Sequence, residues 1–184
     1  MTMKKYSFLA LAQKRRSIRK YQDKPIEREK LKLCLEAARL SPSACNGQPY
    51  KFIVVDDEGV RNNLAKEAFA GIYSICKFAV KAKAFAVIVL QKQKIIARFG
   101  NKMQDIDFRE VDIGIAAEHF VLQAEELGLG TCHIGWFNKK KTAEILKIPK
   151  DYRAELMIAI GYPDEQPKER TKKNFDAVAS FNKY

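Results

Sequence analysis

Residues suited to binding an anion gather in two segments that lie far apart in the chain. They are the run Arg15-Arg16-Ser17-Ile18-Arg19 and a later cluster of Lys168, Arg170, Lys172 and Lys173. A guanidinium group offers planar, paired donors and a charge that does not titrate, which suits the dianion of a phosphate monoester. Most charge runs are solvated surface, however. The two segments therefore predict a phosphate site only if the fold brings them together.

Composition bounds the class of protein. The chain has 184 residues, 47% hydrophobic and 30% charged, as expected for one globular domain over residues 1–184. No apolar run approaches the roughly 18 residues of a membrane span, and the first residues lack a small-residue cleavage site, so we expect a cytoplasmic protein with no membrane partner. Four scattered cysteines and only two histidines, His119 and His133, predict free thiols and no metal site.

The net charge of +12 raises a second hypothesis, a basic nucleic-acid-binding module. The lysines and arginines are spread along the whole chain, however, and the sequence contains no zinc-finger, RNA-recognition or helix-turn-helix signature. An anionic small molecule accounts for the arginine run at least as well, and general basicity then raises its encounter rate with the protein. We therefore expect no nucleic-acid partner.

Hydrophobic periodicity predicts an α+β fold. Apolar residues at helical spacing indicate helices over 7–14, 26–40, 111–127 and 139–146, and one or two helices over 59–81 that break near Gly71. Short apolar runs indicate strands over 51–55, 84–90, 131–134 and 154–160. The run over 84–90 is typical of a strand covered on both faces. Because helices and strands do not alternate regularly, the pattern favours a sandwich over a repeated βαβ unit.

Three segments lack a regular pattern. Residues 41–49 form a polar loop with two prolines, residues 91–109 are a predicted surface excursion where a lid would sit, and residues 164–184 form a polar, extended tail. The Gly128-Leu129-Gly130 sequence follows a predicted helix rather than a strand, so it does not predict a Rossmann dinucleotide site.

Four segments, in this order, resemble the FMN-dependent nitroreductase family. They are the R-R-S-x-R run at 15–19 followed by Tyr21, the S-P-S-x-x-N-x-Q-P loop at 41–49, the L-G-L-G-T-C-x-I-G-x-F segment at 127–137, and G-Y-P at 161–163 with the basic tail. The resemblance covers essentially the whole chain. It implies a dimeric α/β sandwich, with a mixed but mainly antiparallel central sheet flanked by helices, and it implies FMN as the cofactor.

The resemblance assigns the basic residues to the FMN phosphate. Arg15 and Ser17, with Arg170 and Lys172, match the positions that hold the phosphate, and Arg16 lies beside them. The two basic segments would then close on one anion from two sides.

Further positions would lie along the flavin ring. Arg19 matches a position near the pyrimidine edge, where positive charge stabilises the reduced, anionic ring. The backbone of His133, Ile134, Gly135 and Trp136 would follow the ring, with Gly135 allowing a close approach to N5. Many relatives have a small residue at 136, so Trp136 either stacks on a ligand or fills the core. No side chain is assigned a catalytic role.

The resemblance also implies a contribution from a second subunit. Pro42, Ser43 and Ala44 match a stretch that relatives lay against the flavin of the partner, and the amide of Asn46 suits the ribityl chain or the ring edge. The residues alone predict only a turn at Asn46-Gly47. The expected assembly is therefore a homodimer.

The expected activity is transfer of a hydride from NADH or NADPH to a small electron-poor acceptor, such as a nitroaromatic or a quinone. One alternative is a specialised flavin enzyme of the same fold that acts on a halogenated aromatic, an enone or the flavin itself. Another is a flavin-binding protein without turnover. The sequence does not choose between NADH and NADPH and does not name the acceptor.

Overall fold

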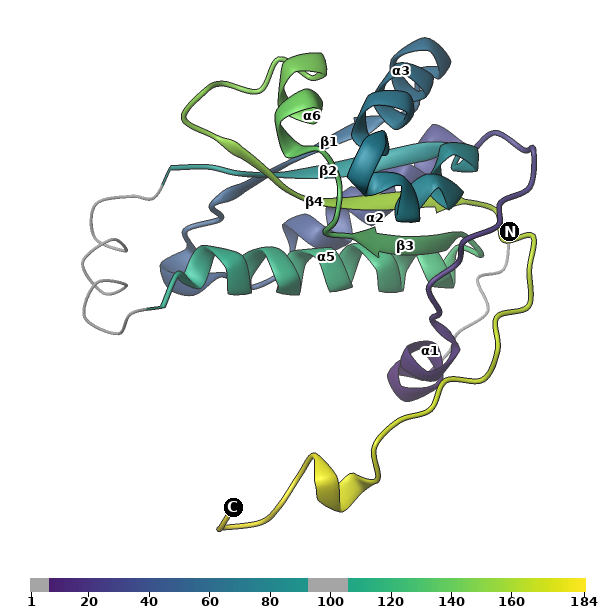
Figure 1. The fold of residues 1–184 in the computed structure, drawn as a ribbon. Coiled ribbons are helices and arrows are strands. Elements are labelled where there is room, and N and C mark those ends of the chain that lie inside the picture. The colour runs from purple at the N-terminus through teal and green to yellow at the C-terminus, as the bar shows by residue number, and fades with distance from the viewer. Residues whose placement is uncertain (1–6, 93–105) are drawn as a thin grey trace.

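The computed structural model describes residues 7–92 and 106–184. At its centre is a four-stranded sheet in the order β1-β2-β4-β3, with three antiparallel strand pairs. The strands are β1 (Tyr50–Val55), β2 (Ala84–Leu90), β3 (Gly130–Ile134) and β4 (Arg153–Gly161). Ser17 adds one parallel bridge to Thr131 of β3. The predicted α+β fold with a mixed, mainly antiparallel sheet is confirmed (Figure 1).

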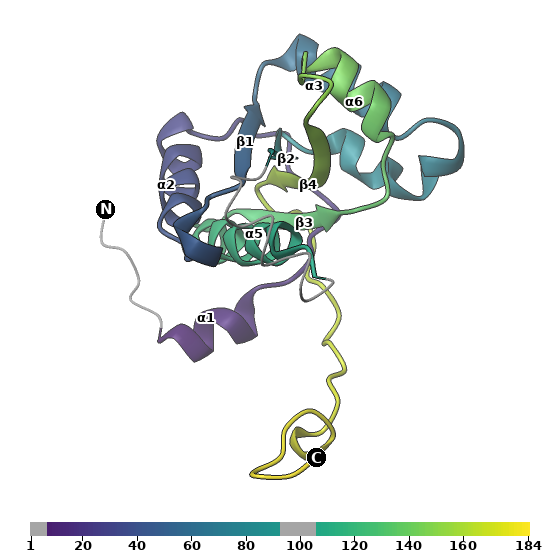
Figure 2. The ribbon, with the colours of Figure 1, turned by 90° about the vertical axis from the view of Figure 1, so that its left-hand side faces the viewer.

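Helices cover both faces of this sheet, as Figures 1 and 2 show. They are α1 (Phe8–Lys14), α2 (Arg28–Arg39), α3 (Glu58–Ala68), α5 (Phe108–Glu126) and α6 (Lys139–Ile145), with the 3-10 helices η1 (Ala44–Asn46), η2 (Gly71–Lys81) and η3 (Phe175–Ala177). The helices α2 and α5 pack on one face, and α3, η2 and α6 pack on the other. The helix α1 lies outside these layers, beside α5.

The strand β2 separates two hydrophobic cores. All of its residues are buried, as expected for a strand covered on both faces. On one face, Ile88 belongs to the same core as Phe120 of α5, whose ring stacks on Phe52 with centroids 5.8 Å apart. On the other face, the ring of Phe85 lies 6.0 Å from that of Phe69. The two cores thus fix α5 on one face of the sheet and η2 on the other.

Residues 15–22, called here the N-terminal arm, pass along the edge of the sheet. The backbone N–H of Ile18 donates to Thr131 of β3 at 2.8 Å, and that of Gln22 donates to Tyr162 at 2.9 Å. Gly130 makes this approach possible, because a Cβ at that position would lie 2.8 Å from the Ile18 side chain. The arm thereby joins β3 to the beginning of the C-terminal tail.

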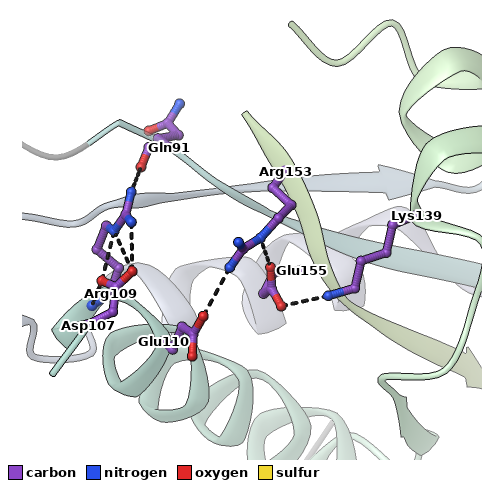
Figure 3. Close-up of polar contacts among 7 residues, drawn as sticks. All are labelled: Gln91, Asp107, Arg109, Glu110, Lys139, Arg153 and Glu155. Carbon is purple, nitrogen blue, oxygen red and sulfur yellow. Dashed lines mark hydrogen bonds and ion pairs between the residues drawn. The ribbon is translucent and has the colours of Figure 1, made fainter. Parts of the chain in front are cut away.

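The two ends of the predicted excursion over 91–109 are held by a polar network. The guanidinium of Arg109 bonds the Asp107 carboxylate at 2.6 Å and the Gln91 carbonyl at 3.2 Å, while Arg153 reaches Glu110 at 3.0 Å (Figure 3). Asp107 also caps α5, so this helix begins three residues before the predicted position. Residues 93–105, which make up most of the predicted lid, lie outside the described residues.

Other predicted boundaries agree with the structure to within a few residues. The break near Gly71 is confirmed, because α3 ends at Ala68 and Gly71 has a φ of +58° at the start of η2. The tail beyond Pro163 runs away from the sheet and contains only the short helix η3 within an extended path (Figure 1). In the described ranges 7–92 and 106–184, no helix combines the length and the apolar character needed to cross a membrane.

Candidate functional site

The two basic segments meet in one hollow, as the sequence predicted. The hollow measures about 410 Å³ and is called here the basic cradle. Its lining residues are Arg15, Arg16, Ser17, Arg19, Glu165, Pro167, Lys168 and Arg170. Five cationic side chains therefore face one carboxylate, and this excess of charge suits a dianion. Figure 1 shows why they meet, because the arm after α1 and the start of the tail run side by side.

The backbone explains how the arm reaches this position. The helix α1 ends at Lys14, and Arg15 has an extended backbone (φ −54°, ψ 125°) that leads away from the helix. Ser17 then bridges Thr131 at the start of β3. The arm also pairs with the tail, since the N–H of Asp164 donates to the carbonyl of Lys20 at 3.0 Å. Both walls of the basic cradle are thus tied to the same edge of the sheet.

Glu165 and Arg170 connect the two walls directly. The Glu165 carboxylate accepts hydrogen bonds from the backbone N–H groups of Arg19 and Lys20, the second at 3.1 Å. Arg170 donates to the carbonyl of Ala12 at 2.8 Å, which satisfies an acceptor in the last turn of α1. The tail is therefore fixed at two points on either side of Lys168.

Lys168, rather than Lys172, lies in the basic cradle. Lys172 was the residue expected to accompany Arg170, but it is exposed and is absent from the described lining. Lys168 belonged to the predicted basic cluster but was not among the residues assigned to the phosphate, and Glu165 was missed. Alternate residues of an extended chain share one side, which groups Lys168, Arg170 and Lys172 together and does not choose between the two lysines.

The loop over residues 42–46 lies elsewhere in the chain. The N–H of Ala44 donates to the buried Asp112 near the start of α5, whereas Arg15 of the basic cradle pairs with Glu118 in the middle of that helix at 3.6 Å. These two positions on α5 are about 9 Å apart along the helix axis, at a rise of 1.5 Å per residue. The described lining of the basic cradle does not include Pro42, Ser43, Ala44 or Asn46.

The segment over residues 133–136, which spans the end of β3, combines a buried half with an exposed half. Ile134 is buried and His133 is partly buried, whereas the side chain of Trp136 is 55% exposed. Trp136 therefore does not fill the core. Its indole N–H donates to the carbonyl of Ile72 at 3.1 Å, and its ring lies 5.4 Å from that of Tyr73. Both partners belong to η2.

His133 and its neighbour Cys132 have the properties of packed residues. Burial lowers the pKa of His133, the Arg15 charge lowers it further, and Glu118 opposes both effects. Cys132 is 4% exposed, and burial raises the pKa of its thiol. A lowered pKa disfavours the imidazolium form that a general acid requires, and a protonated thiol is a poor nucleophile.

The basic cradle and the exposed tryptophan lie at opposite ends of β3. Ser17 bridges Thr131 at the start of the strand, and Trp136 follows its end. Five residues of extended chain span about 16 Å. The strand thus connects a cationic hollow to an aromatic surface over the length of an elongated molecule. A phosphate monoester that carries a flat ring, such as FMN, fits this donor set.

Comparison with known proteins identifies the family of the chain. The Nitroreductase family profile matches residues 12–162. The chain is similar to a solved structure of an FMN-dependent nitroreductase from Clostridium difficile R20291, with 34% identity, a TM-score of 0.75, and coverage of 96% of this chain and 100% of that one. It is also 30% identical to the FMN reductase [NAD(P)H] of Bacillus subtilis strain 168, over 89% of this chain and 68% of the relative. A third relative is the NADPH-flavin oxidoreductase of Vibrio harveyi, 28% identical over 92% of this chain and 71% of that one. The chain therefore belongs to the nitroreductase family.

Proposed function

We propose that this NAD(P)H-dependent flavin oxidoreductase binds FMN and reduces a small electron-poor acceptor, such as a nitroaromatic or a quinone. The observation that carries the proposal is the pairing of the basic cradle with an exposed aromatic surface at the two ends of β3. Membership of the nitroreductase family and the names of the relatives support a flavin as the redox group.

The residues of the basic cradle would hold the phosphate of FMN. Arg15, Arg16, Ser17, Lys168 and Arg170 supply charge-assisted donors from two walls. Such bonds to a charged group contribute about 1.5–3 kcal/mol each, so several together favour FMN over riboflavin, which lacks the phosphate.

The remaining residues would position and polarise the ring. Arg19 follows the bridge of Ser17 to β3 by two residues, with its guanidinium 5.7 Å from the ring centre of Phe78 in η2, and its charge would favour the reduced, anionic form. The backbone from His133 to Trp136 would run along the ring, where Gly135 has open space in place of a side chain. Bound FMN supplies the atom that accepts and returns a hydride.

A homodimer is part of the proposal. Within one chain the loop that contains Pro42, Ser43, Ala44 and Asn46 does not line the described basic cradle, so it would contribute to the site of a second copy. The tail supports this arrangement, because Phe175, Val178 and Phe181 are each more than 60% exposed in a single chain. A second subunit would cover such apolar side chains. We propose a cytoplasmic location, with neither a membrane nor a nucleic acid as partner.

The test is anaerobic reduction of the reconstituted protein. The protein is incubated with FMN, freed of unbound flavin and mixed with NADH or NADPH while the flavin absorbance is followed. The proposal expects one FMN per chain and loss of the absorbance with at least one of the two nicotinamides. Protein that holds FMN and is not reduced by either would instead support a flavin-binding protein without turnover.

A further inference from the structure

The aromatic pair of Trp136 and Tyr73 has a feature that the proposed function leaves unexplained. More than half of the Trp136 side chain is exposed, yet the ring is held in place. Its indole N–H donates to Ile72 at 3.1 Å, and the plane of Tyr73 packs against it at 52°. An exposed indole does not contribute to the folded state the stabilisation that burial of a large apolar ring would provide. A ring that is both fixed and exposed is suited to contact with a ligand.

The hydrogen bond to Ile72 also limits what kind of ligand the ring can recognise. The indole N–H is the only polar group of a tryptophan side chain, and here it already has a partner. The exposed face therefore offers dispersion and ring–ring contacts without a hydrogen bond. Such a face favours flat ligands over puckered ones, and its negative charge density disfavours anionic groups.

The position of the pair relates it to the proposed redox site. Trp136 directly follows Gly135, and a Cβ built at Gly135 would meet no atom within 4 Å. The space beside the end of β3 is thus open in the described chain. The basic cradle lies at the other end of the same strand, so a cofactor held there would extend toward this space.

We infer that Trp136 and Tyr73 form the wall that selects the acceptor, with a flat, uncharged aromatic ring lying against the exposed indole face. The inference rests on the proposed function, because it places the acceptor beside a bound flavin. Offset or edge-to-face contacts between rings require centroids about 4.5–7 Å apart. Tyr73 already holds such a distance to one side of Trp136, and the acceptor would take the open side.

The first test uses binding without turnover. Trp136 is the one tryptophan of the chain, so its fluorescence reports on this position alone. Oxidised, FMN-loaded protein is titrated with benzamide and, in parallel, with cyclohexanecarboxamide, which has the same polar group on a puckered ring. The inference expects a saturable change in fluorescence with benzamide and a half-saturation concentration at least tenfold higher with cyclohexanecarboxamide. Equal responses to the two amides would overturn it.

The second test separates acceptor recognition from the nicotinamide step. The flavin is photoreduced anaerobically, and its reoxidation by 4-nitrobenzamide or by ferricyanide is followed. In Trp136→Leu, the 4-nitrobenzamide concentration for half-maximal reoxidation should rise by about tenfold, a factor within the reach of lost ring contacts. Trp136→Phe should restore most of the affinity. The rate with ferricyanide, which has no ring to stack, should stay within about twofold.

Ile75→Ala is the matched control. Ile75 is 80% exposed in the same helix η2 but does not belong to the ring pair, so the variant removes apolar surface without removing the wall. It should behave as the wild type with both acceptors. An equal loss in Ile75→Ala would overturn the inference in favour of a general apolar surface. Conversion of Trp136→Leu from dimer to monomer in sedimentation would overturn it in favour of a contact between copies.

The two proposals fail in different ways. If NADH and NADPH both leave the bound flavin unreduced, the proposed function fails, while the fluorescence titration still reports on the wall. If the flavin is reduced normally and Trp136→Leu keeps the wild-type dependence on 4-nitrobenzamide, the proposed function stands. The inference that Trp136 and Tyr73 select the acceptor is then refuted.

Discussion

The carboxylate of Asp112 accepts a hydrogen bond from the backbone N–H of Ala44 at 2.9 Å. Asp112 is only 4% exposed, so this contact anchors a polar loop to the buried side of α5. The loop needs an anchor because Cys45, Asn46 and Gln48 all have left-handed φ angles of 46–51°. Non-glycine residues adopt such angles at a cost in free energy that the surrounding contacts must offset.

Replacing Asp112 tests this anchor. Asp112→Ala leaves the N–H of Ala44 without its partner, so the free energy of unfolding should fall by about 1–3 kcal/mol. Asp112→Asn retains an acceptor oxygen and should lose less. Asp151→Ala, which removes an exposed ion pair with Lys92, is the control and should stay within about 0.5 kcal/mol. Chemical denaturation measures all three, and equal losses at the two aspartates would refute the role of Asp112.

Lys168 and Lys172 provide a matched pair for the basic cradle. Only Lys168 is in the described lining, so Lys168→Ala should weaken FMN binding by about tenfold or more, as expected for the loss of a charge-assisted bond. Lys172→Ala carries the same change in net charge and should cost less than about threefold. Titration of each apoprotein with FMN decides between them. The reverse order would return Lys172 to the site and remove Lys168.

Gly130→Ala should disturb the basic cradle through the arm. The added Cβ would lie 2.8 Å from the Ile18 side chain, which must move away from β3, and overpacking of this kind costs about 1–3 kcal/mol of stability. Because Ile18 lies between Ser17 and Arg19, FMN binding should weaken as well. Gly114→Ala in α5 meets no atom within 4 Å and should stabilise the helix by up to about 1 kcal/mol. Thermal unfolding and FMN titration of both variants check the prediction.

The stability should depend on pH through His133. Burial lowers the pKa of its imidazole below the ordinary value of about 6.5, so the unfolded chain takes up a proton at a higher pH than the folded one. The contribution of His133 is therefore complete above about pH 6.5 and is lost as the pH falls toward its folded value. Between about pH 7 and 5, His133→Gln should lose less stability than the wild type. His119→Gln, at an exposed position of α5, is the control and should follow the wild type.

Local patterns in the sequence were sufficient for the elements of the fold. The apolar run of β2 and the break at Gly71 arise from residues within those segments, and both were predicted correctly. The start of α5 was missed because Asp107 caps the helix and Arg109 reaches back to Gln91, a contact that periodicity does not contain.

The site was less predictable, because it depends on contacts between distant segments. The meeting of the two basic segments was expected, but the choice of Lys168 over Lys172 follows from how Glu165 and Arg170 fix the tail on the arm. The position of Trp136 depends on η2, since Ile72 and Tyr73 hold its ring away from the core. Neither the place of Lys168 in the basic cradle nor the contact of Trp136 with η2 can be inferred from the spacing of residues in the sequence.

The central claim is that the basic cradle binds the phosphate of FMN. Titration of the apoprotein with FMN and with riboflavin, which differ only in that group, tests it most directly through the quenching of flavin fluorescence. Two charge-assisted hydrogen bonds of about 1.5–3 kcal/mol each correspond to at least a hundredfold tighter binding of FMN, and raised salt should reduce the difference. Equal dissociation constants for FMN and riboflavin would contradict the assignment of the cradle to a phosphate.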